Sequence, residues 1–178
     1  EKAKNTFDKP VVIVTQAEVI QKEKTKSQEK KTWTFKAESV RDFAFACSRK
    51  FIWDAQAVKI GDKKPLAMSF YPKEGNPLWE KESTQAIKNA LEVYSRQTID
   101  YPYPVAISVH AARQGMEYPM ICFNYGRPDK TGKYTPEVRK GMIGVVVHEV
   151  GHNFFPMIVN SDERQTTWMD EGLNSFVQ

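Results

Sequence analysis

The sequence has few cysteines and no long hydrophobic run, and each shortage excludes a class of protein. Its two cysteines, Cys47 and Cys122, are too few and too far apart for a disulfide framework or a cysteine metal site, and we expect both to be buried thiols. No stretch approaches the roughly 18 consecutive apolar residues of a transmembrane helix, so the sequence predicts no membrane span in this segment. No targeting signal is visible, and a cytoplasmic and an exported location both stay open.

The chain also lacks a large excess of positive or negative charge. The chain has 26 Lys and Arg against 22 Asp and Glu, and the two kinds alternate along the sequence without forming a basic stripe. This pattern argues against a nucleic-acid partner. The densest lysine run, residues 21–31, contains acidic residues as well and predicts a solvated loop or hairpin end. A hydrophobic content of 40% predicts a folded, globular chain.

The first part of the chain has the pattern of short strands. Apolar or alternating segments predict strands at residues 11–14, 32–35, 43–47, 57–60 and 66–71. The turn-like residues 61–65 are the expected domain boundary. We therefore expect residues 1–60 to be the β-rich end of an N-terminal domain, and residues 61–178 to form part of a second domain.

The second part alternates between helical and strand patterns. Residues 77–98 predict an amphipathic helix, and residues 105–109 and 120–123 predict strands. Thr135 followed by Pro136 and Glu137 predicts a helix start, and the apolar residues 142–147 indicate a helix that is buried on most sides. A second helix is expected from Thr167, with Asp170 completing a capping box.

The predicted buried helix carries the sequence His148-Glu149-Val150-Gly151-His152. Residues four apart are neighbours on a helix surface, so the two imidazoles can bind one zinc ion at Zn–N distances of about 2.0–2.1 Å. Glu149 lies beside them and can accept a proton from a water molecule. Because polar groups are costly inside an apolar helix, the sequence predicts a catalytic zinc site.

A catalytic zinc site needs a third protein ligand. One zincin pattern has Gly and His at the positions of Phe155 and Ile158, so that class is excluded. The remaining candidates are downstream carboxylates: Asp162, Glu163, Asp170 and Glu171. We predict that Glu171 is the ligand, since the following helix holds it more rigidly than a loop would, and that Asp170 caps that helix or supports the site.

These residues resemble the gluzincin aminopeptidases, the family of aminopeptidase N and leukotriene hydrolase. That family has His-Glu-x-x-His, then eighteen residues, then the glutamate of Trp-x-Asn-Glu-Gly. Here the segment Trp168-Met169-Asp170-Glu171-Gly172 follows the second histidine at the same spacing. The resemblance implies one Zn²⁺ ion on His148, His152 and Glu171, with Glu149 as the general base.

A second segment extends the resemblance. Gln114-Gly115-Met116-Glu117-Tyr118 is similar to the family's Gly-x-Met-Glu-Asn on the edge strand of the cleft. This similarity implies that Glu117 binds the free α-amine of a peptide substrate, with Gly115 and Met116 beside it in the substrate site. The chain differs from the family at the first and last positions of this segment, and also at Asp170.

The resemblance also implies a fold and a larger protein. The fold would be α+β: a thermolysin-like zincin lobe, with a small mixed β-sheet and active-site helices, after the β-rich end of an N-terminal domain. The partner would be a peptide with a free N-terminus. We expect this chain to be a fragment that lacks N- and C-terminal domains and the family's oxyanion-stabilising tyrosine. Residues 1–178 alone should therefore be weakly active or inactive.

Two alternatives to an aminopeptidase stay open. A thermolysin-type endopeptidase would use the same ligands and base, and would accept peptides with a blocked N-terminus. A non-catalytic relative would use the peptidase scaffold as an interaction module. Such relatives generally lose a ligand or the base, whereas this chain has His148, Glu149, His152 and Glu171.

Overall fold

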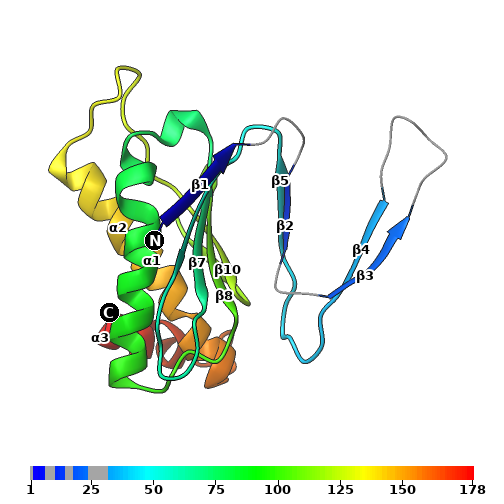
Figure 1. Ribbon diagram of the computed structural model, residues 1–178. Coiled ribbons are helices and arrows are strands. Elements are labelled where there is room, and N and C mark those ends of the chain that lie inside the picture. Colours follow the sequence, from blue (N-terminus) through cyan, green and yellow to red (C-terminus); the bar gives the residue numbers. More distant parts are fainter. Residues whose placement is uncertain (1, 7–10, 15–17, 24–31) are drawn as a thin grey trace.

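The computed structural model describes residues 2–6, 11–14, 18–23 and 32–178 (Figure 1). Its centre is a six-stranded mixed sheet in the order β1-β6-β7-β8-β10-β9. Neighbours are antiparallel except for β7 with β8 and β8 with β10, which are parallel. The strands are β1 (Lys2–Thr6), β6 (Ile52–Ala57), β7 (Leu66–Tyr71), β8 (Val105–His110), β9 (Met116–Tyr118) and β10 (Ile121–Asn124).

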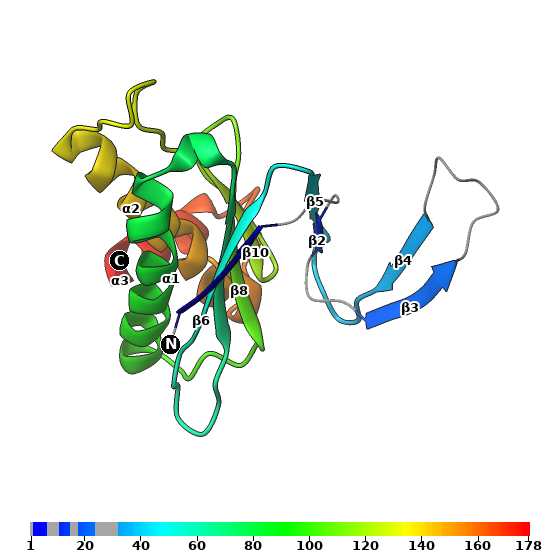
Figure 2. The same cartoon turned by 45° about the horizontal axis from the view of Figure 1, so that its top comes forward.

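Two helices cover one face of this sheet, α1 (Leu78–Gln97) and α2 (Pro136–Gly151) (Figures 1 and 2). The larger apolar core lies between them and the sheet and includes Trp79, Leu91 and Val146. Three short helical segments complete this part: η1 (Lys73–Gly75), η2 (Asn153–Ile158) and η3 (Trp168–Gly172), which continues into α3 (Leu173–Val177). The helix that carries the zinc sequence therefore packs along the sheet and ends beside its β9–β10 edge, where β9 is the outermost strand.

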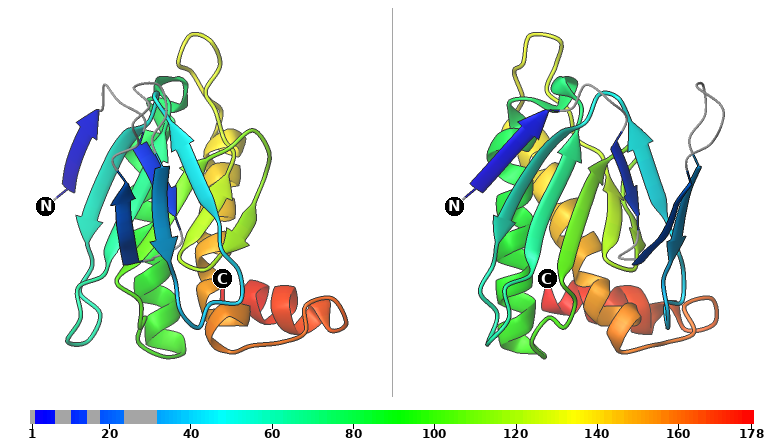
Figure 3. Two further views of the ribbon diagram at one scale, coloured as in Figure 1. Left: turned by 90° about the vertical axis from the view of Figure 1, so that its right-hand side faces the viewer. Right: turned by 45° about the vertical axis from the view of Figure 1, so that its right-hand side comes forward.

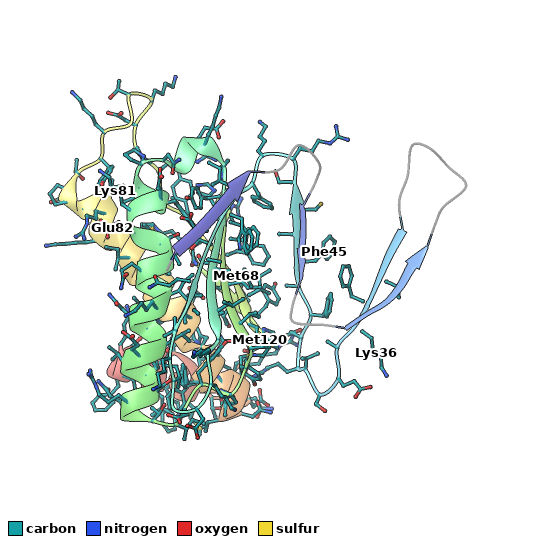
Figure 4. All side chains as sticks on the ribbon, viewed as in Figure 1. Lys36, Phe45, Met68, Lys81, Glu82 and Met120 are labelled. Carbon is teal, nitrogen blue, oxygen red and sulfur yellow. The ribbon has the colours of Figure 1, made fainter. Side chains whose placement is uncertain are left out.

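The opposite face of the sheet is also apolar. A second core cluster there includes Phe70, Ile107 and Ile121, with Met68 and Met120 packed against the same group (Figure 4). Two small antiparallel pairs stand on this side of the sheet (Figures 1 and 3). They are β2 (Val11–Val14) with β5 (Phe45–Ser48), and β3 (Glu18–Glu23) with β4 (Thr32–Lys36).

Most of the predicted strands are present, and one is wrong. A strand was expected at residues 57–60. The strand in this region is β6, which lies earlier in the chain and ends at Ala57. Residues 58–65 form a turn, in which the Val58 N–H donates to the carbonyl of Pro65 at 2.9 Å. The strand pattern of β6 is hard to recognise in the sequence because it contains a charged residue, Asp54. In the structure Asp54 is fully buried and accepts a hydrogen bond from the Tyr71 hydroxyl at 2.8 Å.

The mixed α and β character of the chain is confirmed, whereas the narrower thermolysin-like lobe stays a prediction. The expected boundary at residues 61–65 lies in the connection between β6 and β7, which pair in one sheet. The division into residues 1–60 and 61–178 stays a prediction as well. Most of the lysine run, residues 24–31, lies outside the described residues, and no helix among those described combines the length and apolarity needed to cross a membrane.

Some of the local predictions for helix ends and for burial are confirmed, and others are wrong. The Thr135 cap is confirmed, since its hydroxyl accepts from the Val138 N–H at 3.4 Å. The capping box at Thr167 is wrong: Thr167 has helical backbone angles, and its hydroxyl donates to the Glu163 carbonyl at 2.9 Å. Helix α2 is fully buried along one stripe only, because solvent reaches parts of its other sides. Cys122 is buried as expected, but Cys47 is exposed.

Candidate metal centre

Three side chains from two elements converge at the end of α2. His148 lies in its last turn, His152 is its C-cap, and Glu171 comes from η3. The Nε2 atoms of the two histidines are 3.2 Å apart, with their rings nearly perpendicular at 88°. An Oε2 atom of Glu171 lies 3.0 Å from Nε2 of His148 and 3.6 Å from Nε2 of His152. The structure thus brings the three predicted ligand atoms into one compact triangle.

The size of this triangle can be compared with a zinc coordination sphere. Ligand atoms about 2.0–2.1 Å from a tetrahedral zinc ion are separated by about 3.3 Å from one another. The observed separations of 3.0, 3.2 and 3.6 Å lie around that value. The side chain of Glu171 is 49% exposed, so one side of the triangle is open to solvent, as a catalytic zinc site requires. The donor set therefore fits zinc, and the ligand roles stay predictions.

Hydrogen bonds at the other ring nitrogens orient both imidazoles. Nδ1 of His148 lies 2.9 Å from Oε1 of Gln178, whose amide nitrogen in turn donates to the Gly144 carbonyl at 3.1 Å. Nδ1 of His152 lies 2.8 Å from the Phe155 carbonyl. When Nδ1 carries the proton and donates it, the Nε2 lone pair is free to bind a metal. These contacts favour, in both rings, the tautomer that a zinc ligand needs.

Asp170 supports the site and does not cap a helix. Asp170 is 5% exposed, and its Oδ1 lies 3.0 Å from Nδ1 of His152, close enough for a charge interaction, while the hydrogen bond of that nitrogen is made with the Phe155 carbonyl. Burial is the main cause that raises the pKa of Asp170, and the nearby His152 opposes this shift. A carboxylate behind a ligating histidine fixes the ring and makes it a stronger base.

Replacing Asp170 with alanine is expected to weaken zinc binding by about 10- to 100-fold, the usual effect of removing such a supporting group. Competition with a zinc-selective fluorescent chelator measures this change. Asp170→Asn is the control, because asparagine has nearly the same size and keeps a polar oxygen beside Nδ1 of His152. If the alanine variant binds zinc as tightly as the unmodified protein, Asp170 has no part in the site.

A buried asparagine, Asn174, connects the helical segment that carries Glu171 to helix α2. Asn174 is fully buried; its amide nitrogen donates to the His148 carbonyl at 2.9 Å, and its side-chain oxygen accepts from the Tyr94 hydroxyl at 2.7 Å. This contact requires a close approach at Gly151, where an added Cβ would overlap Asn174 and Tyr94. Glycine at position 151 therefore allows the two ligand-bearing elements to lie side by side.

Gly151→Ala is expected to lower the free energy of unfolding by about 1–3 kcal/mol, the usual cost of forcing extra atoms into a packed core. Gly141→Ala is the matched control in the same helix, since an added Cβ there meets nothing within 4 Å. The control should be neutral or more stable by up to about 1 kcal/mol, because alanine favours a helix. Chemical denaturation of both variants measures the difference, and equal stabilities would contradict the assigned close approach.

The predicted base lies beside the triangle and against β9. Glu149 is 6% exposed, and its pKa is raised to about 8, first by burial and then by the charges of Glu117 and Glu171. Burial also raises the pKa of Glu117. Gly115 has a positive φ of 31°, and an added Cβ there would overlap a carboxylate oxygen of Glu149. The structure thus brings Gly115 and Glu117 to the predicted base.

The other predicted site residue on β9 lies elsewhere. Side chains alternate along a strand, so Met116 projects to the face opposite Glu117 and is 45% exposed. Only its backbone remains available to a substrate at the metal residues. Its strand partner is Phe123, whose ring contacts Tyr118 on that same face.

The third histidine belongs to a separate polar contact. His110 ends β8, and its Nε2 accepts a hydrogen bond from Nε of Arg127 at 3.0 Å. Its ring lies 5.1 Å from that of Trp79. Burial and the charge of Arg127 lower its pKa to about 4, so it is neutral at pH 7. Among the described residues, His110 belongs neither to the triangle nor to the second group that could hold a metal, which is Glu117, His152 and Asp170.

Sequence reasoning missed several residues that hold the site together, namely Gly151, Asn153, Asn174 and Gln178. Asn153 and Asn174 are amides that each stand next to one large apolar residue in the sequence, Phe154 and Leu173, and buried amides need hydrogen-bond partners. That local contrast is the signal that could have identified them. Their partners lie far away in the chain, so the sequence alone could not name them.

Comparison with solved structures shows which fold this is. An M1 zinc metallopeptidase from Deinococcus radiodurans superimposes with a TM-score of 0.68 at 15% identity, covering 99% of this chain and 38% of that one. Legionella pneumophila aminopeptidase A, solved with aspartic acid, gives 0.68 at 13% identity, covering 94% of this chain and 20% of that one. A two-domain M1 zinc metallopeptidase mutant bound to L-arginine gives 0.65 at 15% identity, covering 98% and 38%.

The chain thus has the fold of one part of the M1 zinc metallopeptidases and spans well under half of their length. No protein-family model matches it. The search of curated proteins also found no match.

Proposed function

We propose that this chain is the zinc-binding part of a metallopeptidase that removes N-terminal residues from peptides. The observation that carries the proposal is the triangle of His148, His152 and Glu171, whose ligand atoms are separated by 3.0–3.6 Å. A buried glutamate, Glu149, lies beside it. This arrangement has the ligands, the open side and the base that zinc-assisted hydrolysis needs.

When bound, zinc would polarise the scissile carbonyl and make an attacking water more acidic. Glu149 accepts the proton of that water and passes it to the leaving amine. In the protein without a cation the pKa of Glu149 is about 8. Beside a divalent cation this pKa falls, since a positive charge favours the carboxylate, and Glu149 becomes an effective base at pH 7.

Specificity for a free N-terminus comes from Glu117. It lies on β9, the edge strand of the sheet, which among the described strands pairs only with β10. An extended peptide can add to such an edge through its backbone. Glu117 is directed toward Glu149 and His152, so an ammonium group bound there would place the first peptide bond of the substrate near the metal residues.

The comparisons support this proposal at the level of the fold. The solved neighbours are zinc metallopeptidases and an aminopeptidase, and two of them were solved with a free amino acid, aspartic acid or L-arginine. Because this chain covers 20–38% of these neighbours, we propose that the complete enzyme has further domains. Residues 1–178 alone are then weakly active or inactive.

The test is hydrolysis by the full-length protein of aminoacyl reporters with a free amine and of the same reporters after N-acetylation. An aminopeptidase cleaves the free form, loses activity with a chelator and regains it with zinc. Cleavage of internal bonds in blocked peptides would instead indicate an endopeptidase. Zinc binding without any hydrolysis would indicate a non-catalytic module.

A further inference from the structure

The side chain of Asn153 joins the metal-binding helix to the strand that carries Glu117. Asn153 directly follows the predicted ligand His152 and is 3% exposed. Its side-chain oxygen accepts from the Met120 N–H at 2.8 Å, and its amide nitrogen donates to the Val150 carbonyl at 3.1 Å. One end of this side chain therefore holds the β9–β10 turn, and the other end holds the last turn of α2.

The β9–β10 turn needs such support. Tyr118 pairs with Ile121, so Pro119 and Met120 form a two-residue turn. The turns that best suit two-residue hairpins require a positive φ at the first position, which proline cannot adopt. The positive φ, 64°, falls instead on Met120, a residue with a side chain. The turn is therefore an unfavoured type that contacts from elsewhere must stabilise.

Within the part of the chain that the structure describes, Asn153 is the hydrogen-bond partner of the Met120 N–H. Met120 is 5% exposed, and its carbonyl already accepts from the Ile107 N–H at 2.9 Å. Without Asn153 the Met120 N–H would be buried and unpaired, which is costly. The turn would then move, and the three-residue strand β9 with Glu117 would move with it.

We propose that Asn153 is a positioning residue that sets the distance between Glu117 and the metal ligands, and so determines how strongly the site prefers ligands with a free α-amine. This inference rests on the proposed function. Asn153 touches neither the substrate nor the metal, and it acts through the turn. A displacement of Glu117 by about 1 Å is sufficient to weaken a positioned interaction many-fold.

Two inhibitors separate amine recognition from metal binding: leucine hydroxamate, and the matching hydroxamate that lacks the α-amine. Binding of each to the zinc-loaded full-length protein is measured by calorimetry, which needs no turnover. Asn153→Ala should weaken the amine-bearing inhibitor about tenfold or more and leave the other nearly unchanged. Asn153→Asp should recover most of this loss, because its side-chain oxygen can still accept from Met120.

A second measurement and a matched control keep the test independent of general destabilisation. Asn124 is also fully buried, but its side chain bonds within the sheet, to Ser108 at 2.7 Å and to Cys122 at 3.2 Å. Asn124→Ala should weaken neither inhibitor selectively. Hydrogen exchange across residues 116–122 should accelerate in Asn153→Ala and much less in Asn153→Asp.

The possible failures can be told apart. If the unmodified protein binds both hydroxamates equally, the proposed recognition of a free amine is wrong. If it prefers the amine but Asn153→Ala keeps the full preference, or weakens both inhibitors alike, the role of Asn153 is wrong. Unchanged exchange in Asn153→Ala would also overturn the role, whether or not the protein is a peptidase.

Discussion

Glu149→Gln is expected to lower kcat on a free aminoacyl reporter by about 100- to 10,000-fold, the range in which general bases contribute. Glutamine has nearly the size of glutamate but cannot accept the proton. Zinc content should stay at one ion per chain, because Glu149 is not among the three side chains of the triangle. Folding should not suffer, since burial already disfavours the charged form of this group. Steady-state kinetics and metal analysis of the same preparation check both parts.

The matched control for this variant is Glu92→Gln, which removes a glutamate charge from the surface of α1, where Glu92 pairs with Lys88 at 2.7 Å. It should leave kcat and zinc content unchanged. A Glu149→Gln variant with full activity would remove the base assignment. A variant that is inactive because it has lost its zinc would show that Glu149 belongs to the metal ligands.

Glu171→Ala is expected to reduce zinc affinity more than the loss of Asp170 does, by at least about 100-fold, and to abolish zinc-dependent activity with it. The reason is geometric: Glu171 supplies the only carboxylate of the triangle, 3.0 Å from Nε2 of His148. Two imidazoles alone leave the ion with too few protein ligands for a catalytic site. Zinc titration, and activity at increasing zinc concentration, measure the two effects.

Glu163→Ala is the control, because Glu163 was a candidate ligand in the sequence but lies elsewhere in the structure. Its carboxylate is 3.6 Å from the guanidinium of Arg41. Its removal should leave zinc affinity unchanged. If Glu163→Ala loses zinc and Glu171→Ala keeps it, the triangle is not the metal site, and the carboxylate ligand must be sought in the loop that precedes η3.

The side chains that come together at the end of α2 could be predicted because they follow from local spacing, while their roles as ligands and base stay predictions. Histidines at positions 148 and 152 are neighbours on any helix, and the start signal at Thr135 together with the apolar residues that follow indicates a helix there. Glu171 was selected from four carboxylates by an argument about rigidity, and it is the one that the structure places at the histidines. The supporting aspartate was a weaker prediction, since a capping role and a role behind the metal ligands fit the same sequence.

The failures have different causes. β6 was missed because Asp54 looks like a break in a strand until the Tyr71 hydroxyl satisfies it. The Thr167 cap failed because its hydroxyl bonds backward to Glu163. Cys47 was expected to be buried because free thiols usually are, yet it lies exposed on β5.

By itself, then, the sequence determined which side chains can bind a metal and which one can act as a base, because a helix repeats every 3.6 residues wherever it lies. Only the tertiary structure decided how these groups are held. Asn174 joins Glu171 to α2, and Asn153 joins α2 to the turn before β10. These two hydrogen bonds link residues that are 26 and 33 positions apart in the chain. A local sequence pattern cannot predict such contacts, because the partners come together only when the chain folds.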